Sequence, residues 1–245
     1  MRRTHALSSD CGSDDRAFRD TVTRLRYNLY TALLDRLHIA CAPFLPGNTL
    51  RMLDRAIRAS SARMAKLSPR DDPEYKKSVI DEEYAVIENL LGVSFVVSQI
   101  VIANIASRVM ALSEHHARSN PGTVVPGLSK NRQQLYHFKS TTVARTPHTQ
   151  IEVINAFANY YKHRDDWPLL WNPNTMTGPS MPTALVVSAV GASANDSGNM
   201  RHGLKVLLGR DDYSNSSAIA NIVLTWGTQL HDHYRRELKA LRLVQ

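Results

Sequence analysis

One uncharged run of nineteen residues, NLLGVSFVVSQIVIANIAS, limits the fold of this chain more than any other feature, and it lies between Glu88 and Arg108. Its length is close to what a helix needs to cross a bilayer. Six polar side chains interrupt it, however, and its helical pattern continues into charged flanks without an aromatic belt. A helix that is apolar nearly all round is also what the centre of a helical bundle requires. The run therefore predicts a core helix and no membrane span, with four inaccessible side chains: Leu91, Val96, Ile100 and Ile105.

Helical periodicity accounts for most of the remaining chain. Apolar residues recur at three- and four-residue steps, and the predicted helices span about 15–42, 48–67, 73–118, 147–164, 182–190, 199–208 and 216–243. The connection at 119–145 is expected to hold one short helical turn, around 130–138. The Pro46-Gly47-Asn48 turn is expected to separate the first two, and Thr146-Pro147 to start the fifth. No segment alternates with period two over a sustained length. The predicted fold is all-α, a multi-helix bundle built around a long central apolar helix.

Domain organisation and compartment follow from composition. Residues 1–14 contain no apolar segment of a secretory signal, so they are predicted to form a disordered leader. Residues 15–245 are expected to be a single helical domain, with the 119–145 connection as the place for any internal boundary. Cys11 and Cys41 form no zinc motif, which is typical of a reducing compartment, and we expect a cytoplasmic protein.

The charge balance favours an anionic partner. Thirty Lys and Arg against 22 Asp and Glu leave a formal charge of +8, which suits RNA or DNA, although no Lys/Arg-rich block occurs. Ten histidines invite a metal, but His231 and His233, and likewise His115 and His116, point in different directions on a helix. The glycines form neither a P-loop nor a dinucleotide fingerprint. We therefore expect no metal and no cofactor.

The segment that most suggests chemistry is NAFANYYKHRDDWP, which starts at Asn155. Residues four apart are neighbours on a helix, so Asn155, Asn159 and His163 form one column. Lys162 and Arg164 add positive charge at the helix end, where the macrodipole favours cations. A purely structural helix cap is one interpretation of these residues.

The other interpretation is catalytic. His163 is then a general acid or base toward an RNA 2′-hydroxyl or leaving oxygen, while Asn159 and Lys162 hold phosphate. Glu88 and Gln99 fall on one line of the long helix, as candidates for a polar spot in the bundle, and Glu88 would orient the site. The alternative for this pair is structural, with Glu88 as a helix-end charge and Gln99 as a core amide that has its hydrogen bonds. Asp165 is a further candidate, although adjacent acids before Trp-Pro more often cap a turn.

The stretch Asn159-Tyr-Tyr-Lys-His163 resembles the helix-borne motif of the HEPN superfamily, in which an arginine, often followed by asparagine, precedes a histidine. The resemblance covers about residues 80–167. It implies a helical bundle, commonly dimeric, and in many members a metal-independent ribonuclease of toxin–antitoxin or anti-phage systems. It places the family's asparagine at Asn159 and its histidine at His163. The family's arginine position falls on Ala158, so Lys162 or Arg164 would have to take over its role.

Two functions of different classes remain. The first is an HEPN-like RNA-binding protein, a homodimer that acts as a metal-independent endoribonuclease in bacterial defence or in a toxin–antitoxin pair. The second is a non-catalytic helical interaction module, an antitoxin or complex subunit, whose helices bind a cognate protein.

Overall fold

The computed structural model describes residues 11–41, 44–167, 171–194 and 196–244. These residues form eight α-helices and one short 3-10 turn, and their one bridge of extended backbone joins Thr142 to Thr149. The all-α class predicted from the periodicity is confirmed, and so is the long central helix.

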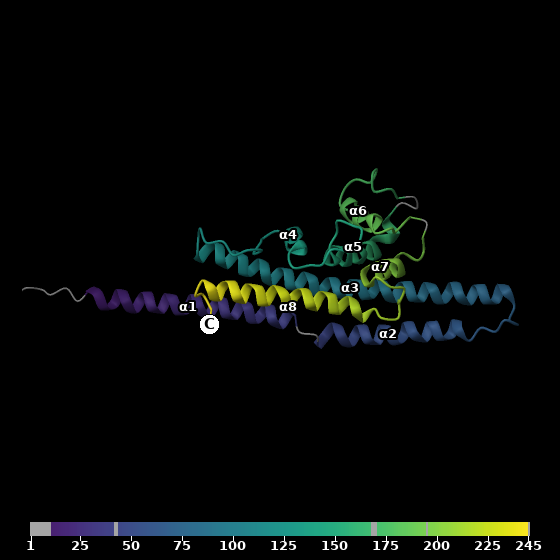
Figure 1. Ribbon diagram of the computed structural model, residues 1–245, viewed down its shortest axis with the longest axis horizontal. Helices are drawn as coiled ribbons and strands as arrows, with labels where there is room; N and C mark the ends of the chain where they lie inside the picture. The colour runs from purple at the N-terminus through teal and green to yellow at the C-terminus, as the bar shows by residue number, and fades with distance from the viewer. Residues whose placement is uncertain (1–10, 42–43, 168–170, 195, 245) are drawn as a thin grey trace, which may run out of the picture.

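The helix α3 (Pro73–Ser119) is the axis of the molecule (Figure 1). Its 47 residues make a rod of roughly 70 Å. Asp72 starts it by accepting hydrogen bonds from the backbone N–H groups of Glu74 and Tyr75. Pro73 takes the first helical position, where proline costs no hydrogen bond because an N–H at that position has no partner within the helix.

The other helices cover α3 from two sides (Figure 1). Along one side run α1 (Cys11–Ala40), α2 (Phe44–Ala65) and α8 (Ser217–Ala240). On the other side α5 (Gln150–His163) and α7 (Asn199–Leu208) pack on α3, and α6 (Met181–Ala189) packs on α5. The short α4 (Arg132–His137) belongs to the connection between α3 and α5. α3 and α8 run in the same direction and end at the same end of the molecule.

The seam between α3 and α5 is closely packed. Phe95 of α3 stacks on Phe157 of α5 with 5.4 Å between the ring centroids, and both are fully buried. Next to this pair, Gly92 faces Tyr161, and a Cβ atom at Gly92 would lie 2.1 Å from a ring carbon. The absence of a side chain at this position therefore lets the two helices approach.

The prediction that the uncharged run is inaccessible is wrong for one face of α3. Leu91 and Ile105 are fully buried, but Val96 is half-buried and Ile100 is 64% exposed. Ile100 lies two turns beyond exposed Val93, on a stripe that the helices on either side of α3 do not cover. Among the described helices, α3 alone is long and apolar enough to cross a membrane, and 44% of its most apolar window is buried in the fold.

Two helix starts differ from the prediction near the N-terminus. α1 begins at Cys11, so the last four residues of the predicted leader are helical, while residues 1–10 lie outside the described residues. α2 begins at Phe44, which puts Pro46 and Gly47 inside its first turn instead of in a separate turn. Proline is tolerated there because N–H groups of the first turn have no intrahelical partner.

The start of α5 also differs, since Thr149 caps it and Thr146 does not. Thr149 and Glu152 form a reciprocal capping box, in which the Thr149 backbone N–H donates to Glu152 Oε2 at 2.8 Å. Thr146 instead donates its hydroxyl to the carbonyl oxygen of Val143 (3.1 Å) in the preceding turn. The Thr-x-x-Glu pattern was therefore the correct start signal.

The connection between α3 and α5 packs on the bundle. Its residues Val125, Leu135 and Val143 are buried in the same cluster as the core side chains of α3, α5 and α8. This packing fixes where Lys139, which follows α4, meets the surface of α8.

Candidate functional site

The amide column of α5 faces α3, where a third amide meets it. The Gln99 side chain donates to Asn155 Oδ1 (2.9 Å) and to Asn159 Oδ1 (2.8 Å). All three side chains are half-buried. An unpaired amide in such a place would cost free energy, so the cluster stabilises the seam between the two helices. This structural role is sufficient to explain the residue types of Asn155 and Asn159.

His163 does not join the amide cluster. Its side chain is 58% exposed, and Nδ1 lies 3.4 Å from Asp166 Oδ2 in the 3-10 turn η1 (Arg164–Asp166) that follows α5. Lys162 is exposed as well. The predicted column is thus divided, with two amides against α3 and the imidazole in solvent.

Neighbouring groups hold the turn after α5 in place. Arg164 Nη2 donates to Asn89 Oδ1 of α3 at 3.0 Å, and the guanidinium lies over the Tyr161 ring, 4.9 Å from its centroid. Arg164 Nε is also 3.7 Å from the carboxylate of exposed Asp165. Ala158, at the family's arginine position, is fully buried, so no cation reaches solvent from there.

Glu88 is buried between α3 and α7 and caps α7. Its Oε2 accepts a hydrogen bond from the backbone N–H of Met200 (2.8 Å), and Oε1 accepts from the backbone N–H and Nε of Arg201 (3.1 and 2.8 Å). The helix has no side-chain cap of its own because Gly198 is its N-cap residue. Burial raises the pKa of Glu88, while the hydrogen bonds from Arg201 and the backbone oppose that shift.

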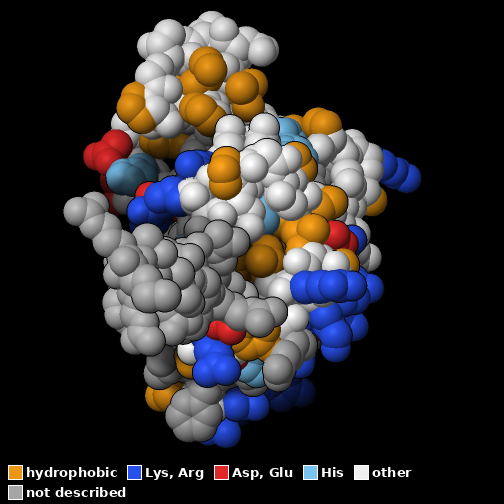
Figure 2. All heavy atoms as spheres, turned by 90° about the vertical axis from the view of Figure 1, so that its left-hand side faces the viewer, with side chains coloured by type: hydrophobic (Ala, Val, Ile, Leu, Met, Phe, Trp, Pro, Cys, Tyr) orange, Lys and Arg blue, Asp and Glu red, His pale blue; other side chains and the backbone are white. Residues whose placement is uncertain are grey.

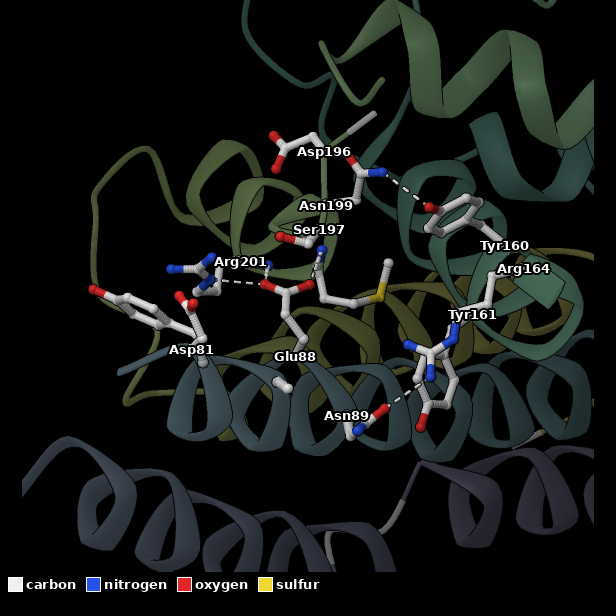
Figure 3. A pocket seen from close by; sticks show the side chains of 13 residues that line it. Asp81, Glu88, Asn89, Tyr160, Tyr161, Arg164, Asp196, Ser197, Asn199 and Arg201 are labelled. Carbon is white, nitrogen blue, oxygen red and sulfur yellow. Dashed lines mark hydrogen bonds and ion pairs between the residues drawn. The ribbon is translucent and has the colours of Figure 1, made fainter. Parts of the chain in front are cut away.

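A polar cavity of about 540 Å³ opens beside this cap (Figure 3). Arg201 lies over the Tyr84 ring at 4.1 Å on one wall, and Arg164 on Tyr161 forms the opposite wall. Glu88 and Arg164 are thus two predicted site residues that the structure brings to one cavity. Three acidic and two cationic side chains line it, so its charges largely balance.

The most strongly basic hollow lies on α8. Four cationic side chains line this hollow of about 790 Å³ together with Gln229 and Asp232: Lys139, Arg235, Arg236 and Lys239. All four are exposed, and none of them has an ion pair with an acidic group among the described residues. The lining acid, Asp232, lies 3.1 Å from His231 Nδ1. Figure 2 faces the end of the molecule at which α3 and α8 end, and it shows Lys and Arg side chains gathered on one flank.

Sequence reasoning missed this surface, although part of its signal is local. Arg235, Arg236 and Lys239 are spaced so that they share the exposed side of α8, which the apolar stripe of that helix could have indicated. Lys139 is distant in sequence and joins them only because the preceding connection packs on the core. No local pattern indicates that approach.

The other titratable groups have structural partners. Burial raises the pKa of the Cys41 thiol to about 12, so the thiol stays protonated at neutral pH. Nε2 of His116 lies 3.0 Å from the carbonyl oxygen of Thr123, and Nε2 of His233 lies 2.8 Å from that of Pro126. Among the described residues, no group of three or more His, Cys, Asp or Glu side chains is arranged to hold a metal ion.

Comparisons with known protein families, curated proteins and solved structures give no match to this chain. Its functional assignment therefore depends on its own residues and their geometry.

Proposed function

We propose that the protein binds RNA through a basic surface formed by Lys139, Arg235, Arg236 and Lys239. The observation that supports this most strongly is the group of four exposed cations without acidic partners. Arg235 and Lys239 are four residues apart on α8, where like charges repel and destabilise a helix slightly. Phosphate groups of a bound strand would relieve that repulsion.

The backbone at Lys139 is in a conformation that it shares with Arg145 and Arg242, which lie outside this surface. Its φ is +59°, in the left-handed region that costs an L-residue roughly 1–2 kcal/mol and that glycine adopts freely. Side chains held in such conformations often serve a function. Here the strained position contributes one of the four cations.

Phosphate contacts determine how such binding depends on salt. Each contact with a single strand releases counterions and contributes about 0.7 to the slope of log K against log salt. Four contacts predict a slope of about 3, with weak binding at physiological salt.

The test is fluorescence anisotropy with labelled RNA of about twelve nucleotides, from about 50 mM salt upward. The triple variant Arg235→Gln, Arg236→Gln, Lys239→Gln is expected to lower the slope by about 2. The matched control, Arg55→Gln, Lys66→Gln, Arg70→Gln, makes the same change of net charge at exposed cations elsewhere. Equal weakening by both triples would overturn the proposed surface, and the absence of RNA binding would overturn the function.

RNA cleavage at His163 is the second candidate. It is favoured by the Asp166 carboxylate 3.4 Å behind Nδ1, because this arrangement orients an imidazole and leaves Nε2 open to a substrate. Incubation of labelled RNA in EDTA, with His163→Ala as the control, tests it. Cleavage that persists in the variant would exclude His163 as the acid or base.

The two surfaces are far apart on the bundle. Arg164, next to His163, contacts Asn89, whereas Gly227 of α8 lies beside Ile105, roughly 24 Å further along α3. The cations of α8 lie still further in that direction (Figure 1). A strand held on α8 would therefore need several more nucleotides to reach His163, and cleavage should require a longer RNA than binding.

The protein-interaction alternative has its own supporting observation. Val93 and Ile100 are 38% and 64% exposed on one stripe of α3. Apolar side chains exposed along one stripe favour contact with a protein partner or a second copy of the chain. Sedimentation of the protein with and without Ile100→Glu tests this alternative, because a dimer that uses the stripe should dissociate in the variant.

A further inference from the structure

A second hollow adjoins the basic one along α8. It has a volume of about 240 Å³ and shares Lys139 and Gln229 with the basic hollow. Its wall is formed by the residues that follow Lys139 and by Gln150, and its floor by the first half of α8. The two hollows therefore make one groove, which runs from Asn221 to Lys239 over roughly 27 Å of helix.

The two halves of the groove differ in chemistry. Lys139, Arg235, Arg236 and Lys239 make one half cationic. The other half presents Asn221, Thr225 and Gln229, which are exposed, lie four residues apart on one line of α8, and have no side-chain hydrogen bond among the described residues. Neutral amides add nothing to counterion release, but each carries both donors and an acceptor. The lining of this half is partly apolar, and its amides are the groups that can recognise a base, so we call it the amide half. The amide half therefore suits base edges and the cationic half suits phosphates.

We propose that the groove holds a single-stranded RNA segment, with phosphates on the cationic half and the bases of the next nucleotides against Asn221 and Gln229. This inference rests on the proposed function and adds the form of the RNA and the way its bases are contacted. Asn and Gln pair in a bidentate manner with adenine, and unstacked bases of single strands expose the edges that such pairs need. The groove should therefore prefer adenine.

The size and lining of the groove explain why a single strand fits. The hollow of the amide half, about 240 Å³, is too small to take in a duplex, whereas unstacked bases of a single strand can reach its amides. Trp226, which lines it, is 2% exposed and donates its Nε1–H to the carbonyl oxygen of Phe138 at 3.0 Å. Among the described lining residues of this half, no aromatic face is therefore open for base stacking, and hydrogen bonds and phosphate contacts must supply the affinity.

The test compares labelled oligoadenylate and oligouridylate of about twelve nucleotides on the full-length protein at about 50 mM salt. Both strands carry the same phosphates, so any difference in affinity reports the bases. We expect the adenylate to bind about tenfold more tightly. Asn221→Ala with Gln229→Ala should bring the two affinities to within about twofold and leave the salt slope unchanged, since no charge is removed. The matched control is Asn28→Ala with Asn104→Ala, two exposed amides on other helices without a described partner, and it should preserve the preference.

The outcomes separate this inference from the proposed function. Two results would overturn the base contacts proposed for Asn221 and Gln229 and leave RNA binding in place. One is salt-dependent binding of both strands with equal affinity, and the other is a preference for adenylate that survives the two substitutions. If a duplex of the same length binds more tightly than the adenylate, the proposal that the groove holds single-stranded RNA is overturned. If oligoglutamate binds as tightly as the adenylate, the role of the bases is overturned and an acidic protein partner is favoured. Failure of both strands to bind would overturn the proposed function itself.

Discussion

Two helices of this protein, α5 and α8, carry clusters of positive charge near their C-terminal ends, and the two clusters are embedded differently. After α5, Arg164 lies on Tyr161 and bonds to Asn89, and carboxylates lie near both Arg164 and His163. The cations of α8 have no ion pair with any described acidic group. Both placements suit the helix dipole, so the dipole does not distinguish them.

Charge density along the sequence is therefore a poor guide to a binding surface unless the partners of each charge are known. Lys162-His163-Arg164 is the denser cluster in the sequence, yet its charges are partly neutralised by the turn that follows it. If this comparison is right, substitutions near the end of α5 should mainly change stability, and substitutions on α8 should mainly change RNA binding.

The largest effect is expected at Glu88, beside the α5 turn. Glu88→Ala removes three hydrogen bonds to α7 and leaves Arg201 without its ion-pair partner, so the free energy of unfolding should fall by about 3 kcal/mol. Urea denaturation measures this change. The control is Asp81→Ala, at an exposed acid in the same cavity, and it should cost less than about 1 kcal/mol. RNA binding that falls with Glu88→Ala while the protein remains folded would contradict the comparison.

Glu88 also gives the protein a specific dependence on pH. Because its pKa is raised in the folded state, the native protein binds a proton where the unfolded chain does not. Its contribution to stability is therefore full below the unfolded value of about 4.3 and is lost as the pH rises through the folded value. Glu88→Gln cannot titrate, so the difference in unfolding free energy between wild type and variant should change across this interval. A constant difference from pH 4 to pH 7 would contradict the raised pKa.

The second effect tests the α8 surface by charge reversal. Arg235→Glu with Lys239→Glu should weaken RNA binding by about thirtyfold at about 50 mM salt and leave the melting temperature nearly unchanged, because both side chains are exposed. Lys162→Glu with Arg164→Glu makes the same change of charge at α5. It should lower the melting temperature, through loss of the Asn89 bond, and weaken binding by less than about threefold. The reverse pattern would move the proposed RNA-binding surface from α8 to α5.

A third, smaller effect is expected from substitutions that leave the cations at the end of α5 without nearby carboxylates, as on α8. Asp165→Asn with Asp166→Asn removes the carboxylates near Arg164 and His163 and leaves the cations in place. If pairing is what suppresses RNA contact there, affinity at low salt should rise by about threefold and the salt slope by about 0.7. Unchanged binding would show that the acids do not suppress contact at α5.

The helices could largely be predicted from the sequence, because their signals are local. The apolar periodicity was enough to predict that α3 and α8 are helices. The predicted start of α3 at Pro73, after Asp72, is also the start in the structure. The start of α5 was missed because Thr146-Pro147 competes with the Thr149 capping box, and the extended bridge at Thr149 decides between them. That bridge depends on tertiary packing.

The site was less predictable because its groups meet across long separations. Glu88 was recognised as a polar position on α3, but its partner Arg201 lies more than a hundred residues away. Asp54 of α2 likewise caps α8 by accepting a hydrogen bond from the backbone N–H of Ser216 at 2.7 Å. A carboxylate that caps another helix leaves no signature in its own segment. Lys139 joined the α8 cations in the same nonlocal way.

The smallest expected effect is also the most selective test of the α8 surface. Lys139→Gly removes one cation and places a residue without a Cβ at a φ of +59°. Glycine relieves the left-handed strain but increases the entropy of the unfolded chain, so the melting temperature should stay the same or rise slightly. The salt slope of RNA binding should nevertheless fall by about 0.7, the contribution of one phosphate contact. Arg145→Gly, at φ +64°, is the matched control, because it makes the same chemical change at a residue that does not line the groove. We expect both variants to keep their stability and only Lys139→Gly to lose one phosphate contact. That result would show that the Lys139 side chain serves RNA binding and not stability. Equal slopes for the two glycine variants would remove Lys139 from the surface.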